Sequence, residues 1–184
     1  MSNPLGRPRD EELTAKVLKA TYELLSKHHY HEISLVKVAE VAGVSRKALY
    51  SRWQNKIELV VEAFNFFNPP EMPDLQGSVK QQLLDYLEQS VAVSNQNPTL
   101  FGDILADILG SPQAQAFFDK AYTQPRWKIY SQILEKGVEQ GEFSADMNIP
   151  LVVESLSAIF RSRILQQKTI EKSFINEVVT LLVR

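Results

Sequence analysis

The sequence predicts an all-α protein of about nine to ten helices, with an N-terminal three-helix helix-turn-helix domain and a C-terminal helical bundle. Apolar residues recur at helical spacing along almost the whole chain, and no stretch shows the alternation typical of a β-strand. Glycines, prolines and capping residues divide this pattern into separate helices. With 184 residues, 44% of them hydrophobic, the chain is long enough to bury a substantial core.

The most informative stretch runs from residue 34 to residue 56. Its apolar residues recur at helical intervals on both sides of Gly43, which can adopt the positive φ that a tight turn requires. Ala39 and Ala42 are small enough for two helices to cross closely, and Ser45 can cap the second helix. A helix-turn-helix fits this pattern. The recurring apolar residues are Val38, Val41, Val44, Leu49 and Trp53.

The second helix of this motif has a basic outer face. If Val44, Leu49 and Trp53 point inward, the residues left on or near the surface are Arg46, Lys47, Tyr50, Ser51 and Arg52. Helical hairpins with a glycine turn also occur in ordinary all-α domains, and exposed charged faces are often only solvated. Spacing alone therefore leaves DNA binding and plain packing both open.

The full string of residues is more specific than its spacing. From Ala39 to Lys56 it contains A-x-x-A-G-V-S-x-x-x-L-Y-x-x-W-x-x-K, which closely resembles the signature of the TetR-type (TetR/AcrR) transcriptional repressors. The resemblance covers about the first third of the chain. It implies a ligand-responsive DNA-binding transcriptional regulator, with a repressor as the first hypothesis, whose partners are a double-stranded DNA operator, a second copy of the chain and an unknown small-molecule effector.

This hypothesis defines a set of expected DNA contacts. A recognition helix presents its N-terminal outward residues to base edges, so residues 46, 47, 48 and 51 are expected in the major groove, with residue 52 at its margin. Residues 34 and 50 are expected to hold phosphate, residue 37 adds charge on the same side, and the resemblance implies a phosphate contact for residue 56. The full set is Arg7, Arg9, Ser34, Lys37, Ser45, Arg46, Lys47, Ala48, Tyr50, Ser51, Arg52 and Lys56.

Charge is distributed unevenly along the chain. Residues 1–56 hold ten Lys and Arg against six Asp and Glu, a charge of +4, whereas residues 57–184 carry −6, which gives the net charge of −2. A basic N-terminal third suits contact with phosphate. Residues 1–9 are expected to form an extended arm that places Arg7 and Arg9 in the minor groove, with a disordered tail as the alternative. Asp10 is then expected to cap the first helix.

A fourth helix is expected to start at Asn55, whose spacing to Glu58 is that of a capping box. Its expected inward residues are Leu59, Val60, Ala63 and Phe67, and three prolines follow within residues 68–77. We therefore expect an arm and helix-turn-helix DNA-binding domain at 1–67 and a ligand-binding and dimerisation domain at 68–184. Further helices are expected at about 79–91, 100–108, 111 to a break near Pro125, 127–138, 150–167 and 170–183.

Six aromatic residues are expected to line a cavity for an apolar or aromatic effector, with plain core packing as the alternative. Phe64, Phe66 and Phe67 are expected to transmit the effect of the ligand through the fourth helix. The expected cavity residues are Phe101, Phe117, Phe118, Tyr122, Trp127 and Tyr130.

A two-fold homodimer is also expected, because a single helix-turn-helix reads too few base pairs to be selective, and the operator should then be an inverted repeat. The segments 126–140 and 150–167 are expected to form most of its interface. The last two helices are apolar over more than one face, which favours a partner, although buried helices of a large bundle are the alternative. The expected interface residues are Ser155, Ala158, Ile159 and Ser162.

Two rival hypotheses are an all-helical small-molecule binding protein or enzyme without DNA binding, and a structural dimer that contacts another protein through its basic face. The chain has no GxSxG, HExxH or ExxH pattern, and Asp103 and Asp107 have no histidine partner. The cluster His28, His29 and His31 lacks accompanying ligands, so we expect no enzyme, cofactor or metal site. The chain has no cysteine, no stretch long enough to span a bilayer and no signal peptide, and we expect a cytoplasmic protein.

Overall fold

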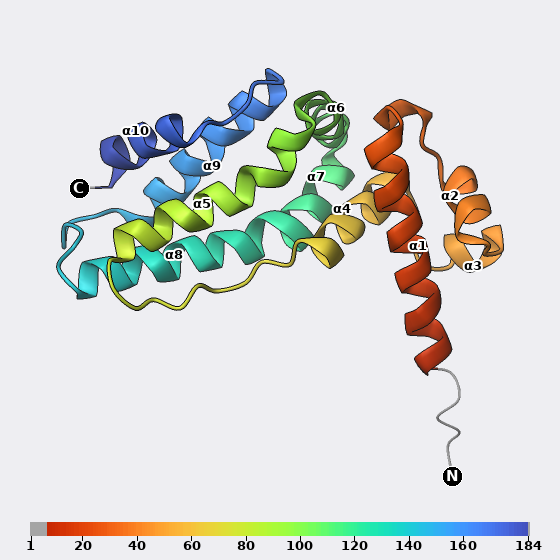
Figure 1. Cartoon of the computed structure of the whole chain (residues 1–184), viewed down its shortest axis with the longest axis horizontal. Coiled ribbons are helices and arrows are strands. Elements are labelled where there is room, and N and C mark those ends of the chain that lie inside the picture. The colour runs from red at the N-terminus through yellow and green to blue at the C-terminus, as the bar shows by residue number, and fades with distance from the viewer. Residues whose placement is uncertain (1–6, 184) are drawn as a thin grey trace, which may run out of the picture. The chain divides into compact units, whose positions relative to one another are not determined.

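The computed structural model describes residues 7–183, with side chains from residue 11 onward, and every regular element in this range is a helix (Figure 1). The predicted all-α class is therefore confirmed. The chain forms two compact units, one made of residues up to 69 with 110–122 and the other of 70–109 with residues from 123 onward. The boundary expected after residue 67 differs from this division in the segment 110–122, which belongs to the first unit.

The first unit holds the predicted helix-turn-helix. In this unit α1 packs against α2 and α4, α2 packs against α3, and α4 packs against α7. Its core includes Val17 and Leu25 of the first helix, Tyr30 and Val60, all almost completely buried. Its elements are α1 (Arg7–Lys27), the 3-10 turn η1 (Tyr30–Glu32), α2 (Leu35–Ala42), α3 (Arg46–Tyr50), α4 (Lys56–Phe67) and α7 (Pro112–Phe118).

Four helix starts have side-chain caps, and the sequence analysis expected those at Ser45 and Asn55. The Ser34 hydroxyl accepts the backbone N–H of residue 37, the Ser45 hydroxyl accepts that of residue 48, and Ser111 does the same for residue 114. Asn55 accepts the N–H of Glu58 at 2.9 Å. The Glu58 carboxylate returns to the N–H of residue 54 at 2.8 Å, one position earlier than in a standard capping box.

The start of α1 differs from the prediction. The helix begins at Arg7, so Asp10 lies inside its first turns and is not the N-cap. The prolines and the glycine of residues 1–9 favour an extended arm, but Pro8 is compatible with a first helical turn, where a backbone N–H has no intrahelical acceptor anyway. The part of the expected arm at residues 1–6 lies outside the described residues.

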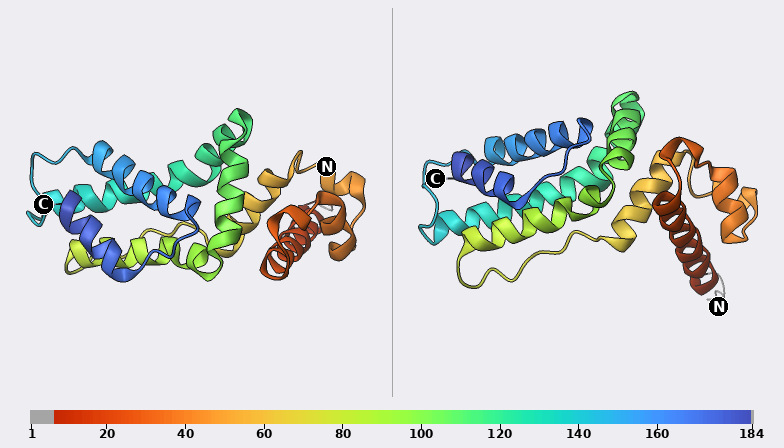
Figure 2. Two further views of the ribbon diagram at one scale, coloured as in Figure 1. Left: turned by 90° about the horizontal axis from the view of Figure 1, so that it is seen from above. Right: turned by 45° about the horizontal axis from the view of Figure 1, so that its top comes forward.

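The second unit is a bundle in which α8 and α10 both pack against α5 and against α9, while α6 packs against α5 and α9. Figure 2 shows α5, α8, α9 and α10 side by side from two further directions. The inward stripe of α5 consists of Val79, Leu83, Leu87 and Val91, which are all buried. The elements are α5 (Val79–Gln96), α6 (Pro98–Leu109), α8 (Gln124–Glu139), α9 (Ile149–Leu165) and α10 (Lys172–Leu182).

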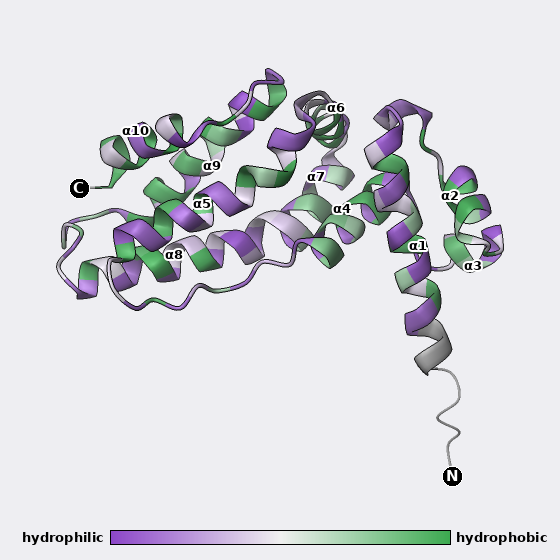
Figure 3. Ribbon diagram, viewed as in Figure 1, coloured by the Kyte–Doolittle hydropathy of each residue, from purple (hydrophilic) through white to green (hydrophobic). Residues whose placement is uncertain are grey.

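The segment before α8 has the predicted irregularity. Residues Asp119–Thr123 form a π-helical stretch, η2, and Pro125 follows in the first turn of α8. The other end of α8 is at Glu139, and Gly141 follows two residues later with a φ of +73°. In Figure 3 apolar and polar residues alternate along the helices of both units, as in amphipathic helices. Within the part of the chain that the structure describes, no helix is long and apolar enough to cross a membrane.

Two tight contacts hold the second unit together. The ring of Phe143 packs directly on the backbone at Gly137, where any added Cβ would overlap it. Asn95 of α5 makes two hydrogen bonds to the backbone of Ile170, donating to its carbonyl at 2.8 Å and accepting its N–H at 2.9 Å. This pair fixes the connection between α9 and α10 against the end of α5.

A carboxylate from the loop after α8 caps the start of α5. Glu142 accepts the backbone N–H of Val79 at 2.8 Å and that of Lys80 at 3.0 Å, and the Ser78 hydroxyl donates to it at 3.0 Å. These donors, led by the N–H of Lys80 and then that of Val79, favour the ionised form and lower the pKa of Glu142 from its ordinary value. The ionised carboxylate of Glu142 therefore joins the loop after α8 to the N-terminus of α5.

We expect Glu142→Gln to lower the melting temperature at neutral pH, because an amide replaces a carboxylate that accepts three donors. The pKa of Glu142 is depressed in the folded protein, so its contribution is present above the unfolded pKa and is lost as pH falls through the folded pKa. The difference between wild type and variant should then shrink in acid, measured by thermal denaturation across pH. Glu139→Gln, which removes only an exposed pair with Lys136, is the matched control, and an equal loss there would contradict the capping role.

Candidate nucleic-acid interface

The recognition helix α3 is short, and its inner side anchors it. Leu49 is fully buried and Trp53, which follows the helix end, is only 2% exposed. The backbone N–H of Trp53 donates to the carbonyl of Leu49 at 3.1 Å, so the chain continues to turn after Tyr50. With these two side chains inside, Arg46, Lys47 and Tyr50 are exposed, as predicted from the spacing.

The turn between α2 and α3 has the predicted conformation. Gly43 has a φ of +65° and ends α2, with its N–H bonded to the carbonyls of Ala39 and Glu40. Ser45 then starts α3. Val41 differs from the other apolar residues of the motif, because its side chain is 54% exposed on the last turn of α2. A valine at this position faces solvent because the inner side of α2 is already occupied by Val38 and Ala39.

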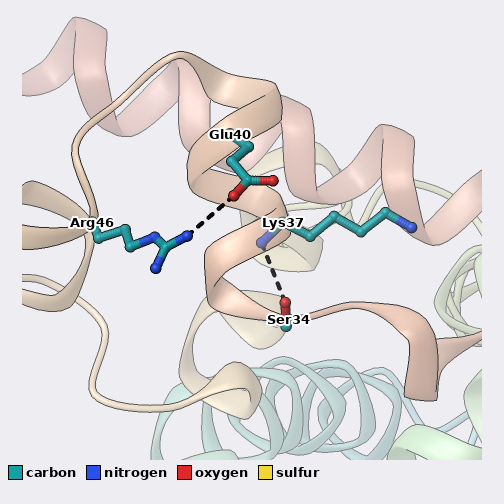
Figure 4. A network of polar contacts seen from close by, with 4 residues as sticks. All are labelled: Ser34, Lys37, Glu40 and Arg46. Carbon is teal, nitrogen blue, oxygen red and sulfur yellow. Dashed lines mark hydrogen bonds and ion pairs between the residues drawn. The ribbon is translucent and has the colours of Figure 1, made fainter.

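Arg46 has a partner on α2 that the sequence analysis did not identify. Its Nη2 donates to Oε1 of Glu40 at 3.2 Å, and the two side chains are 63% and 64% exposed (Figure 4). The helical spacing gave no signal for this contact, because the two residues lie on different helices. The six-residue separation across a glycine turn is the only feature of the sequence that could have indicated it.

The start of α2 has the geometry expected of a phosphate anchor. Ser34 is exposed, and its Oγ accepts the N–H of Lys37 at 3.2 Å, which leaves the hydroxyl hydrogen available to donate. The first N–H groups of a helix have no intrahelical acceptor, and the helix dipole favours an anion there. In Figure 4 the Lys37 side chain extends away from the pair formed by Glu40 and Arg46.

Lys56 is held by the protein itself. Its Nζ donates to the carbonyl of Tyr30 at 3.3 Å and lies 3.7 Å from the centroid of the Tyr30 ring. These contacts join the first turn of α4 to η1. The phosphate contact that the resemblance implies for Lys56 stays a prediction.

The remaining predicted contacts lie around α3 and at the start of α1. Ser51 is exposed and its hydroxyl donates to the carbonyl of Ala48 at 2.8 Å. Arg52 is half-buried, with Nη1 donating to the same carbonyl at 3.4 Å. Arg7 and Arg9 lie in the first turns of α1 rather than in an extended segment, and their side chains are outside the described residues.

The aromatic residues of the first unit form two local groups. Phe118 stacks on Tyr122 with ring centroids 4.9 Å apart, at the junction of α7 and η2, and Phe117 is half-buried in the same helix. On α4 the expected inward residue Phe67 is 40% exposed, and Phe64 is buried instead. The prediction for Phe67 is wrong because Phe67 is the last residue of α4, where the buried stripe has ended.

Tyr22 of α1 contacts both of these α4 rings. Its centroid lies 6.0 Å from that of Phe64, edge to face, and 4.6 Å from that of Phe67. Phe66, also exposed, packs edge-on against Phe67 at 5.1 Å. The three residues expected to transmit a ligand signal therefore belong to one aromatic group at the end of α4.

The other three predicted cavity residues belong to the second unit. Tyr130 is buried and packs edge-on against Tyr86 with centroids 5.2 Å apart. The indole N–H of Trp127 donates to the Ser157 hydroxyl at 2.6 Å and links α8 to α9, while Phe101 is half-buried on α6. A cavity lined by these aromatic residues stays a prediction.

The predicted dimer residues lie on the outer side of α9. Ala158 and Ser162 are exposed and Ser155 is half-buried, whereas Ile159 packs against the core of the second unit. Leu151 and Leu165, which the sequence analysis did not assign to the interface, are 57% and 39% exposed on this helix. Their spacing to Ser155 and Ser162 is the signal that could have identified them.

No arrangement for metal binding or catalysis emerges from the described side chains. His28 lies 3.6 Å from the Glu32 carboxylate, and no group of three or more His, Cys, Asp or Glu residues in the described part of the chain could hold a metal ion. The chemistry of the α2–α3 surface is instead that of hydrogen-bond donors and positive charge on a short exposed helix. Such a surface defines a helix-turn-helix DNA-binding protein.

Comparison with known proteins agrees with this class. Residues 17–63 match the family model described as bacterial regulatory proteins of the tetR family, and residues 72–182 match the tetracyclin repressor-like C-terminal domain. The chain belongs to the TetR family of transcriptional regulators, and the resemblance found in residues 39–56 is confirmed. It is thus a DNA-binding regulator of transcription, in a family whose members are generally not enzymes.

Individual relatives extend the similarity over the full length. The HTH-type transcriptional regulator YdeS of Bacillus subtilis (strain 168) is 25% identical, over 97% of this chain and 92% of its own. The crystal structure of the TetR family transcription regulator SCO0332 has 25% identity and a TM-score of 0.74, covering 93% of this chain and 97% of that one. FadR from Bacillus subtilis, in complex with stearoyl-CoA, shares the fold at 16% identity with a TM-score of 0.70, covering 92% and 97%.

We expect Arg46→Ala and Lys47→Ala each to weaken binding to a selected operator duplex, by about 1–3 kcal/mol for a side chain that makes a bidentate base contact. Fluorescence anisotropy on the operator and on single-base variants would measure both affinity and base preference. Lys128→Ala, which removes one exposed positive charge from α8, is the matched control. Unchanged affinity and preference in both α3 variants, at wild-type melting temperatures, would contradict the assignment.

Proposed function

We propose that this regulator is a repressor that binds an inverted-repeat operator as a homodimer and is released by a small apolar or aromatic ligand. The observation that carries this proposal is the exposed basic surface of α3. Arg46, Lys47, Tyr50 and Ser51 project from a helix held from inside by two buried residues. Base edges in the major groove offer hydrogen-bond acceptors for such donors.

A homodimer follows from the size of this surface. The helix α3 has five residues, which can reach only a few base pairs. Two copies related by a two-fold axis would read two half-sites and multiply the selectivity. Selection of duplexes from a random pool by the purified protein would test this directly, because enriched sequences should contain an inverted repeat, and enrichment of single unpaired half-sites would oppose it.

The helix α9 offers a face for the second copy. One face of α9 carries residues that follow one another at spacings of four, three, four and three. We define the α9 stripe as these residues, Leu151, Ser155, Ala158, Ser162 and Leu165. This is the spacing of a helix seam, with small residues between two leucines, and it lets another helix approach closely. Leu151 is 57% and Leu165 39% exposed in the single chain.

The opposite side of α9 is already used. Val152, Val153, Leu156 and Phe160 are buried in the core of the second unit. The α9 stripe is therefore a second apolar face, and burial of apolar surface stabilises by about 25 cal/mol per Å². A second copy of the same chain, presenting the same stripe across a two-fold axis, supplies a matching surface.

The proposal of an apolar effector rests on the second unit. Tyr86 of α5 packs edge-on against Tyr130 of α8, and Trp127 of α8 donates its indole N–H to Ser157 of α9. FadR from Bacillus subtilis, a protein of the same fold, is in complex with stearoyl-CoA, which carries a long apolar chain. Both facts support a ligand with a large apolar part.

Such a ligand can change DNA binding only if it binds one spacing of the two DNA-reading units more tightly than another. We propose that the aromatic group of Phe64, Phe66 and Phe67 carries this difference to the helix-turn-helix. In that case the ligand and the operator lower each other's affinity by the same factor.

We expect Ala158→Arg to convert the dimer into a monomer. In a two-fold interface the two arginines would be buried near each other without partners, which costs about 3 kcal/mol or more. Size-exclusion chromatography with light scattering at micromolar concentration would measure the mass. Ala92→Arg, at an exposed alanine of α5, is the matched control, and a dimer that persists equally in both variants would exclude this face.

We expect apolar or aromatic effectors to raise the melting temperature by about 5–10 °C at one hundred times their dissociation constant, and to weaken operator binding in proportion. A thermal-shift screen followed by anisotropy on the operator would measure both effects. Trp127→Leu should reduce the stabilisation, while Lys128→Ala, its neighbour on the outer side of α8, should retain it. Compounds that stabilise the protein but leave operator affinity unchanged would refute the coupling.

A further inference from the structure

We infer that Glu40 is a positioning residue for DNA recognition, which orients the guanidinium of Arg46 for a guanine and lowers its affinity for backbone phosphate. The inference rests on the proposed role of α3 as the recognition helix. It adds a specificity-determining residue from the neighbouring helix α2. The observation behind it is the contact between Arg46 Nη2 and Glu40 Oε1 at 3.2 Å.

The geometry of the motif produces this contact. Glu40 lies on the last turn of α2 and Arg46 is the first residue of α3, directly after the cap Ser45. The left-handed conformation of Gly43 turns the chain so that the two residues face each other. A position at the start of the recognition helix is where contacts with base edges are made.

The contact occupies one part of the arginine only. A guanidinium has five N–H donors in a planar fork, and Glu40 accepts from a single terminal nitrogen. Figure 4 shows this nitrogen directed at Glu40 and the other terminal nitrogen directed away from it. The remaining donors can therefore bind a guanine while the carboxylate holds the plane of the fork.

The pair has no evident role in folding. Both side chains are almost two-thirds exposed, and such surface pairs add little to stability. A nearby lysine does not share the carboxylate, since Lys37 extends away from Glu40 in Figure 4. The ion pair therefore acts mainly on the orientation and the net charge of Arg46.

Specific and non-specific DNA are affected in opposite directions. On the operator, a guanidinium that is already oriented loses less side-chain freedom, which is worth a factor of about 2 to 10 in affinity. On random DNA, an arginine bound to a carboxylate neutralises no phosphate, and Glu40 itself repels the backbone. Glu40 thus raises the ratio of operator affinity to random-DNA affinity, because it strengthens operator binding and weakens binding to random DNA.

The test measures Glu40→Gln in the full-length protein on the selected operator and on a random duplex, over a range of salt concentrations. We expect operator affinity to fall by about 2- to 10-fold. Affinity for random DNA should rise, and its slope against log salt should steepen by about 0.9, which is one phosphate contact. Replacing the guanine read by Arg46 should also weaken binding less in the variant than in wild type.

Two further variants separate positioning from charge. Glu12→Gln removes the same charge from a comparable exposed pair with Lys16 on α1, at 3.0 Å, and should change both affinities by the same factor or not at all. In an Arg46→Gln background, Glu40→Gln should no longer change the ratio of affinities, because its effect passes through Arg46.

Three results would overturn the inference. The first is an unchanged ratio of operator affinity to random-DNA affinity in Glu40→Gln. The second is an equal change of this ratio in Glu12→Gln. The third is a change of this ratio by Glu40→Gln that persists in the Arg46→Gln background. A wild-type protein that selects no duplex at all would instead overturn the proposed function. Thermal denaturation of each variant would show that the exposed substitutions leave the fold intact.

Discussion

The DNA-reading surface depends on the burial of Leu49 and Trp53. The helix α3 has five residues, and isolated helices shorter than about 12–15 residues are marginal in water, so it is held by packing. Both side chains are almost completely buried, and the Trp53 indole N–H donates to Glu62 at 2.6 Å. A buried donor without that partner would cost about 1–3 kcal/mol. The exposed positions of α3 are therefore fixed from inside the unit.

Side-chain caps then determine where each short helix begins. Ser34, Ser45 and Asn55 each bond a backbone N–H of the turn that follows, and Gly43 supplies the one left-handed residue between α2 and α3. Because these positions fix the path of the backbone, residues from two helices meet on its outer side. The contact between Glu40 and Arg46 is a consequence of that path and requires no long-range packing.

Local features of the chain were predictable from the sequence, whereas contacts between elements were not. Caps such as Ser34 and the turn at Gly43 depend on a few neighbouring residues, so their chemistry is visible in the string. Phe67 was expected to point inward because it fits helical spacing, but it is the last residue of α4 and is exposed, and helical spacing does not show where a buried stripe ends. The start of α1 was missed because a proline within the first turn resembles a helix breaker. The ion pair between Arg46 and Glu40 and the capping of α5 by Glu142 join residues that lie on different elements, and no periodicity in the sequence connects them.

The difference between local features and contacts between elements also decides what membership of the TetR family establishes for this chain. In the string from Ala39 to Lys56 most of the specified residues form the turn, the cap, the anchors and the small packing positions, and Tyr50 is an exposed exception. Among the unspecified positions, Glu40, Arg46, Lys47 and Ser51 are exposed. A motif that specifies the scaffold and leaves several exposed positions open can keep one geometry while those side chains change. Recognition of the family thus defines how α3 is presented, and under the proposed role of α3 the operator is selected mainly by exposed side chains that the signature does not constrain.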